Sequence, residues 1–406
     1  NEFEKLSKIF EPKENFASAK NKKIAETLWN RAAGWLGTEK ANAADSKIIK
    51  IEVLDASGNV DEKIQRRIEE NVDPVKVKVL KPERAFRPGR YSLRVEMLSA
   101  DGTQVLTATQ DFTWGVLAIN LNKSIYSPDE TSKLQFAVLD ETGDMVCDAK
   151  LKLEIKNKKL EIKDELSTED GTIKINQENC NSKEFTLTPD YEAEYKVGEW
   201  GNYAMTLTAE TAEGIYTIAD SFEVSNLIPF DVERMSATRI YPANKYPVAF
   251  NITANEDFKG QVIEEVPNDF EISEFDIQNS DIENSFEIQN SKFKIVDQQN
   301  EKQLVWDIDV KKGDQFSLGY QYQAPEMSPQ FYLLGPLQFK EKGQTIFEEA
   351  REWQVASDDP AAAEDPSNAS NLPKVDADKR RAFKNDRTDF TAGENPEFDI
   401  DMSGAA

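Results

Sequence analysis

The most regular feature of the chain is a two-residue alternation of apolar and polar positions, first seen at Ile49, Ile51 and Val53. Successive side chains of a strand point to opposite faces, so this period predicts strands with one buried face. Similar short segments recur up to residue 356, separated by turn signals such as Asp170-Gly171, which is typical of a hairpin. No helical period separates them. The pattern therefore predicts an all-β chain of tandem Ig-like antiparallel β-sandwiches.

The first 46 residues depart from this pattern. Apolar side chains recur there at spacings of three and four before Gly37, namely Ile24, Leu28, Ala32, Trp35 and Leu36. This spacing predicts a short N-terminal amphipathic helix over residues 18–36, ended by the glycine. Its lysines allow a role at a membrane surface, but we favour a helix that packs its tryptophan face on a neighbouring domain.

Turn signals and shifts in composition divide the chain into consecutive segments. We predict a helical segment and linker at 1–46, a first β-sandwich at 47–116, a second at 117–226, a third at 227–356 with a low-complexity insertion at 273–300, an acidic linker at 357–385, and the start of a further, truncated sandwich at 386–406. Within the insertion, Phe275–Ser280 is nearly repeated as Phe286–Ser291, which slippage in a long loop explains without a function.

One short motif recurs at the boundaries between these segments. In each copy a basic residue and an aromatic residue precede a turn and an alternating strand. The copies are Arg84-Ala-Phe86-Arg87-Pro88-Gly89, Lys123-Ser-Ile-Tyr126-Ser-Pro128-Asp129-Glu130 and Arg387-Thr-Asp-Phe390-Thr-Ala-Gly393-Glu394. The repetition indicates tandem units.

The second copy, followed by Phe136-Ala-Val138-Leu-Asp140, resembles the opening of the macroglobulin MG2-like β-sandwich found in large bacterial surface proteins. The resemblance covers about residues 117–224, and Asp129 replaces the glycine usual in that turn. The third segment, which ends in Gly335–Phe339 and Glu349–Trp353, resembles adhesin-type repeat domains of such proteins. The chain has no Gly-Cys-Gly-Glu-Gln thioester, so the resemblance implies no protease-trapping chemistry here.

Composition narrows the partners and the location. The chain has 406 residues and a formal net charge of -26, which disfavours nucleic acid and anionic membrane surfaces as partners. No stretch of about 18 apolar residues is present, so we expect no membrane span. The chain starts at Asn1 without a methionine, and we expect a segment of a longer extracellular or cell-surface protein. Its expected partners are the neighbouring domains of that chain, with other surface proteins or glycans as alternatives.

Catalysis has little support in the sequence. The chain contains no histidine, which excludes nucleophiles activated by histidine and histidine-based zinc sites. Among 75 acidic residues no pair of carboxylates is diagnostic of a hydrolase. We therefore predict no catalytic residues, no cofactor and no enzyme. If the chain does bind a cofactor, the expected one is Ca²⁺ between the domains, held by Asp358 or Asp359.

The two cysteines, Cys147 and Cys180, are candidates for a disulfide, which would persist in an oxidising exterior.

The favoured function is a non-enzymatic stalk or spacer of a bacterial cell-surface protein. An adhesive module for a carbohydrate or protein ligand and a secreted carboxylate-dependent hydrolase remain the alternatives. The burial of the tryptophans distinguishes the spacer from the adhesive module. A structural role predicts buried tryptophans, and an adhesive role predicts exposed ones. The tryptophans in question are Trp114, Trp200, Trp306 and Trp353.

Overall fold

The structure is a computed structural model of the whole chain, in which part of the chain can be described. The described residues are 38–40, 48–55, 58–69, 74–80, 85–98, 104–140, 145–159, 163–180, 186–241, 244–274, 293–298, 301–327, 329–358, 383–384, 387–391 and 394–400. The predicted helix over 18–36, the near-repeat at 275–291 and residues 359–382 of the predicted acidic linker lie outside them.

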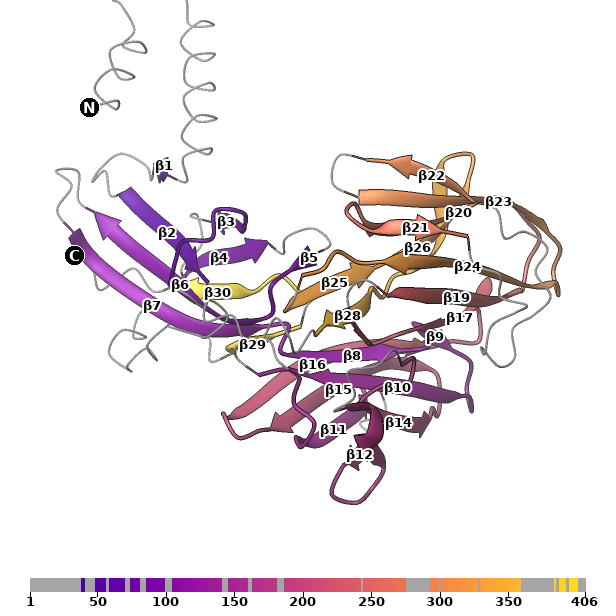
Figure 1. Cartoon of the computed structure of the whole chain (residues 1–406), viewed down its shortest axis with the longest axis horizontal. Helices are drawn as coiled ribbons and strands as arrows, with labels where there is room; N and C mark the ends of the chain where they lie inside the picture. Colours follow the sequence, from indigo (N-terminus) through magenta and orange to yellow (C-terminus); the bar gives the residue numbers. More distant parts are fainter. Residues whose placement is uncertain are drawn as a thin grey trace, which may run out of the picture.

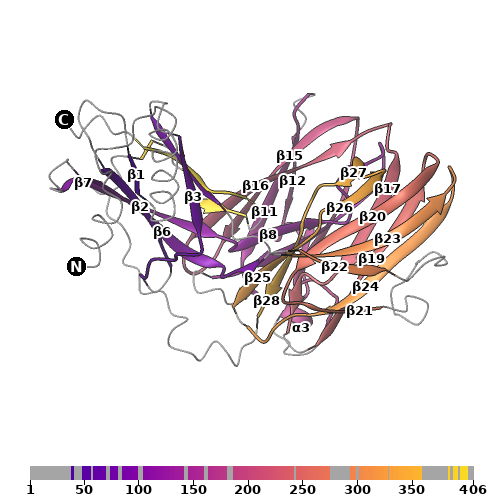
Figure 2. The ribbon, with the colours of Figure 1, turned by 90° about the horizontal axis from the view of Figure 1, so that it is seen from above.

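Most of the described residues lie in strands, and most of the strand pairs are antiparallel, which confirms the predicted fold class of tandem Ig-like β-sandwiches. Figures 1 and 2 show the first sandwich at one end of the molecule and the third at the other, with the second packed between and beneath them in the view of Figure 1. The sandwiches therefore pack side against side and are not arranged end to end without mutual contacts.

The first sandwich consists of a five-stranded and a three-stranded sheet. In spatial order, the strands are β1 (Thr38–Lys40), β2 (Ile48–Leu54), β6 (Gly89–Leu98), β7 (Gln104–Trp114) and β29 (Asp389–Phe390), and then β3 (Gln65–Glu69), β4 (Val75–Leu80) and β30 (Glu397–Ile400). β2, β6 and β7 form an antiparallel meander whose inward residues, such as Val53, Leu93 and Phe112, fill the core. The alternation seen in the sequence therefore corresponds to burial.

The C-terminal residues correct the predicted organisation. Residues 386–406 were expected to begin a further sandwich, but β29 runs parallel to β7 and β30 runs antiparallel to β4. The yellow strands beside the indigo and purple ones in Figure 1 show this return of the chain. Phe390, Phe398 and Ile400 of these two strands are buried in the core of the first sandwich, so the strands complete that sandwich.

The second sandwich consists of a four-stranded and a five-stranded sheet. One sheet contains β13 (Ile173–Ile175), β14 (Tyr191–Lys196), β10 (Thr131–Val138) and β8 (Leu117–Leu121), and the other contains β12 (Lys163–Ser167), β11 (Lys150–Asn157), β15 (Gly201–Glu210), β16 (Ile215–Val224) and β9 (Ile125–Tyr126). A single helical turn, α3 (Gln177–Cys180), follows β13. β9 runs parallel to the last strand, β16, and all the other pairings are antiparallel.

The third sandwich contains three sheets. They are formed by β17 (Phe230–Ser236), β19 (Lys245–Ala254), β24 (Gln315–Gln323) and β21 (Glu271–Ser273); by β22 (Lys294–Asp297), β23 (Glu301–Val310), β20 (Phe258–Pro267), β26 (Leu337–Glu341) and β27 (Gln344–Glu349); and by β18 (Arg239–Ile240), β28 (Trp353–Ser357), β25 (Gln330–Leu334) and β5 (Ala85–Phe86). β5 belongs to the first sandwich by sequence, so this last sheet already joins two sandwiches.

Candidate functional site at the sandwich junctions

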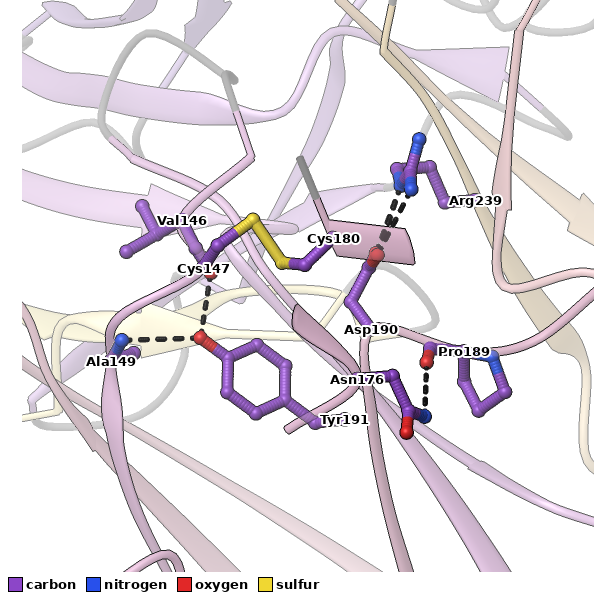
Figure 3. Close-up of a disulfide and its surroundings, with 9 residues drawn as sticks. All are labelled: Val146, Cys147, Ala149, Asn176, Cys180, Pro189, Asp190, Tyr191 and Arg239. Atoms are coloured by element: carbon purple, nitrogen blue, oxygen red, sulfur yellow. Dashed lines mark hydrogen bonds and ion pairs between the residues drawn. A yellow bond between two sulfur atoms is a disulfide. The ribbon is translucent and has the colours of Figure 1, made fainter. Parts of the chain in front are cut away.

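Cys147 and Cys180 are disulfide-bonded in the structure, with Cα atoms 5.6 Å apart. The bond ties the segment before β11 to α3 at one end of the second sandwich. Figure 3 shows Tyr191 beside it, whose hydroxyl donates to the Val146 carbonyl at 2.8 Å and accepts from the Ala149 amide at 3.1 Å. The two candidate residues are therefore bonded to each other in the structure, and their bond links two segments of the second sandwich.

An ion pair between two sandwiches lies close to this disulfide (Figure 3). Arg239 of β18 donates to both carboxylate oxygens of Asp190, with Nε to Oδ2 at 2.9 Å and Nη2 to Oδ1 at 3.0 Å. The two residues are 4% and 1% exposed, so both charges have left water. Burial raises the pKa of the Asp190 carboxyl, and the attraction of the Arg239 guanidinium does not fully offset this effect. A buried pair of this kind tolerates the loss of neither partner.

A reciprocal pair of hydrogen bonds joins the same two sandwiches at β8 and β28. The Asn120 amide nitrogen donates to the Gln354 carbonyl at 2.8 Å, and the Gln354 backbone amide donates to Asn120 Oδ1 at 2.9 Å. Both residues are buried. One side chain thus satisfies the backbone of a strand in the other sandwich, which fixes the register between them.

The turn from β27 to β28 places a second charged group at this junction. Arg351 donates through Nη1 to Asp220 and to the Ser221 carbonyl, and through Nη2 to the Ile119 carbonyl at 3.1 Å. Glu349 accepts a hydrogen bond from the Ser124 backbone amide. Burial raises the pKa of Glu349 to about 7, although the Ser124 hydrogen bond and the nearby arginines act in the opposite direction.

The recurring motif forms the opening of the second sandwich. The Tyr126 hydroxyl donates to Asn122 Oδ1 at 2.8 Å, and Glu130 accepts from the Ser127 backbone amide at 2.7 Å. Lys123 Nζ lies 3.0 Å from Glu130 and 2.7 Å from Asp231 of the third sandwich. Asp129 has a φ of 66°, so it adopts the left-handed conformation that glycine usually supplies in this turn.

The first sandwich is attached to the other two at Gly115 and Phe86. Gly115, which lies between β7 and β8, has a φ of +73°, and a Cβ atom there would lie 3.1 Å from the Phe86 ring. Phe86 stacks on Phe331 of the third sandwich with ring centroids 6.0 Å apart. The core of the first sandwich also includes Leu139 and Leu333, so it is continuous with both neighbours.

A cavity of about 210 Å³ lies where the first sandwich, the second sandwich and the C-terminal residues meet. Its acidic lining includes Asp111 and Asp389. Arg90 Nη2 lies 2.7 Å from Asp111 Oδ2, and Asp389 accepts hydrogen bonds from the Thr113 hydroxyl at 2.6 Å and from the Thr217 backbone amide at 3.2 Å. Both carboxylates thus anchor neighbouring strands.

The tryptophans divide between burial and exposure. Trp114, Trp306 and Trp353 are buried, and Trp353 Nε1 donates to the Ala237 carbonyl at 2.9 Å. The expectation of burial was wrong for Trp200, which is 53% exposed and has the Lys159 ammonium 3.2 Å from its ring centroid. It lies directly before β15, where an apolar residue need not belong to the alternation of the strand.

The described residues offer no metal-binding cluster and no membrane-spanning helix. They contain no group of three or more acidic, cysteine or histidine side chains placed to hold a metal ion. Asp358, one of the two expected calcium ligands, is buried, and its backbone amide donates to the Ile240 carbonyl at 3.1 Å, while Asp359 lies outside the described residues. In the same part of the chain, no helix has the length and apolar character needed to cross a membrane.

Comparison with known proteins gives only distant similarity. No protein-family model and no curated protein sequence matches the chain. Among solved structures, a cohesin module from a Clostridium perfringens family 33 glycoside hydrolase is similar over 32% of this chain and 98% of its own, with 13% identity and a TM-score of 0.22. Native Escherichia coli alpha-2-macroglobulin is similar over 74% of this chain and 23% of its own, with 8% identity and a TM-score of 0.22. The FN1-FN3 domains of chicken CNTN1 are similar over 80% of this chain and 98% of their own, with 8% identity and a TM-score of 0.18.

The chain therefore spans about a quarter of the macroglobulin to which it is similar. The three TM-scores are 0.22 or lower.

Proposed function

We propose that this chain is a rigid, non-enzymatic spacer within a bacterial cell-surface protein, in which three sandwiches act as one structural unit. The observation that carries the proposal is the buried Arg239–Asp190 pair across the junction of the second and third sandwiches. Interfaces between domains that open and close freely are usually polar and hydrated. Opening this junction would separate two desolvated charges and the Asn120–Gln354 hydrogen bonds together. The spacing of the sandwiches is therefore fixed.

Two further features support a location outside the cell. The Cys147–Cys180 disulfide would be stable in an oxidising compartment, and a formal net charge of -26 favours solubility at a crowded surface. Intact cells that produce the protein, probed with an antibody raised against residues 48–358, test this location. Labelling of unpermeabilised cells is expected. Labelling that requires permeabilisation would contradict the proposal.

An adhesive module is the second candidate, because Trp200 presents a half-exposed indole beside Lys159. Aromatic faces of this kind stack on apolar ligand surfaces. Binding to a glycan panel, compared between the native chain and a Trp200→Ala variant, tests it. A ligand whose binding disappears in the variant would favour adhesion over a purely structural role.

The carboxylate-dependent hydrolase is the least favoured alternative. The cavity that holds Asp111 and Asp389 offers two acidic groups, but each is hydrogen-bonded to neighbouring strands. A general acid or base must reach a proton of the substrate. The contacts of Asp111 instead join β7 to β6, and those of Asp389 attach the C-terminal residues to the first and second sandwiches.

A further inference from the structure

The first sandwich is completed by a segment that comes from the other end of the chain. We call the described residues 383–384, 387–391 and 394–400 the C-terminal arm. The contact between Thr113 and Asp389 joins residues that are 276 positions apart, with the second and third sandwiches between them in sequence. The arm is therefore a non-local part of the fold.

Backbone hydrogen bonds hold the arm on two strand edges at once. On β7, the Thr113 amide donates to the Thr388 carbonyl at 2.7 Å, and directly after β7 the Gly115 amide donates to the Phe390 carbonyl at 3.0 Å. On β4, the Val79 amide donates to the Pro396 carbonyl at 2.8 Å, and β30 continues the ladder. Without the arm, both edges would present unpaired amides, which is how sheets recruit further strands.

Apolar side chains of the arm fill the space between the two sheets. Phe390 and Phe398 each pack edge-on against Phe112, with centroids 6.1 and 5.2 Å away, and both are buried with Ile400. They join the cluster that contains Val77 and Trp114. The site for the arm is thus an apolar groove flanked by two hydrogen-bonding edges.

The arm has the local structure that opens the second sandwich. Glu394 accepts from the Thr391 amide at 2.8 Å and pairs with Arg387 at 2.7 Å, just as Glu130 accepts from Ser127 and pairs with Lys123. β9 lies parallel to the last strand of its sandwich, and β29 lies parallel to β7. The arm is therefore the opening segment of a sandwich, docked on strands that precede it in sequence.

We propose that the groove between β4 and β7 is a strand-docking site for this opening segment, and that a second copy of this chain can occupy it with its own arm. An arm from another copy makes the same backbone and aromatic contacts, so the exchanged state differs only in which chain provides the strands. The chain's own arm competes through its high effective concentration. This inference rests on the contacts of the arm and holds whether or not the chain is a spacer.

Disulfide trapping between full-length chains tests the exchange. Lys78 and Glu397 are cross-strand partners whose Nζ and Oε1 atoms are 2.6 Å apart, with exposed side chains. An acceptor that carries Lys78→Cys and Phe398→Asp, whose own arm is weakened, is mixed with a donor that carries Glu397→Cys. Under mild oxidation we expect a disulfide-linked species of twice the chain mass. A labelled peptide of residues 383–402 should compete for its formation.

The matched control moves Phe398→Asp to the donor, so that the acceptor carries only Lys78→Cys. A buried aspartate at that position should weaken capture by about tenfold or more. Equal yields in both mixtures would show random collision and overturn the proposal. Equal yields when the acceptor carries its cysteine at Lys152, an exposed position on β11, instead of at Lys78 would do the same. Phe398→Asp could prevent the acceptor from folding. A mixture of Lys78→Cys chains and Glu397→Cys chains, neither of which carries the aspartate, controls for this effect. If neither that mixture at high concentration nor the first gives the linked dimer, the arm binds only its own chain and the proposal is wrong.

Discussion

Arg239 in the third sandwich and Asp190 in the second form a two-point ion pair that is almost fully shielded from water. The pair lies beside the disulfide of the second sandwich, so the Asp190 side of the junction belongs to a braced region (Figure 3). Such geometry indicates a junction that is fixed when the chain folds, because opening it would separate two buried charges that are hydrogen-bonded to each other.

Loss of one member of this pair should be costly. We expect Asp190→Ala to destabilise the chain by about 3 to 5 kcal/mol, because it removes the carboxylate that compensates the buried charge of the Arg239 guanidinium. Calorimetry of the variant and the native chain measures the change. Lys150→Ala, which removes the exposed pair with Glu210, is the control and should cost less than about 1 kcal/mol. Equal losses in both variants would show that the junction contributes no more than a surface contact.

Glu349 should make stability depend on pH. Its pKa rises from 4.5 to about 7 in the folded chain, so between these values the folded state holds a proton that the unfolded state releases. Stability from this group is therefore present below about pH 4.5 and is lost as the pH rises to about 7, by about 3 kcal/mol in total.

Glu349→Gln isolates this contribution, because glutamine keeps an oxygen for the Ser124 amide and does not ionise. The free energy of unfolding of the variant, relative to the native chain, should increase steadily from pH 5 to pH 7. Denaturant titrations at several pH values measure it. A difference that stays constant over this interval would mean that Glu349 ionises as readily in the folded chain as in the unfolded one.

The disulfide should stabilise the second sandwich. Cys147 and Cys180 are 33 positions apart, and closing a loop of this size reduces the entropy of the unfolded chain by an amount worth about 3 to 4 kcal/mol. We expect the double variant Cys147→Ser, Cys180→Ser to melt at a lower temperature than the native chain. Mass spectrometry of the intact, alkylated protein should find no free thiol. Two alkylated cysteines in the native protein would argue against the bond and weaken the extracellular location.

Trp353 should be structural. Its ring is buried in the core of the third sandwich and its Nε1 donates to the Ala237 carbonyl. Trp353→Ala should cost about 3 to 5 kcal/mol, since it opens a cavity and removes the hydrogen bond. Trp353→Phe keeps most of the volume and should cost less. Trp200→Ala serves as the exposed comparison, and a loss there as large as at Trp353 would contradict the assignment.

The strands could be predicted because burial on one face leaves a period of two in the sequence. Ile49, Ile51 and Val53 alternate in the sequence, and all three belong to the core of the first sandwich. Asp170-Gly171 was correctly recognised as a turn, but it connects β12 and β13 of opposite sheets and forms no hairpin. A turn dipeptide sets the local backbone and leaves open which sheet the next strand joins.

The junctions and the arm could not be predicted, because they depend on contacts between distant residues. Asp190 and Arg239 lie 49 positions apart, and nothing in their neighbouring residues distinguishes them from the other charged side chains. The arm did carry a signal, since Arg387, Phe390 and Glu394 repeat the motif of Lys123, Tyr126 and Glu130. That repeat identified an opening segment but not the sandwich that it completes.

The central claim, that the sandwiches form one rigid unit, is tested most directly by the distance distribution between two spin labels. Lys150 of the second sandwich and Lys259 of the third are exposed strand positions that can be replaced by labelled cysteines. Pulsed electron paramagnetic resonance of the doubly labelled chain should give a single narrow distance, which broadens when Asp190→Ala is added. A broad distribution in the chain with its junction intact would show that the second and third sandwiches move independently, and would contradict the account.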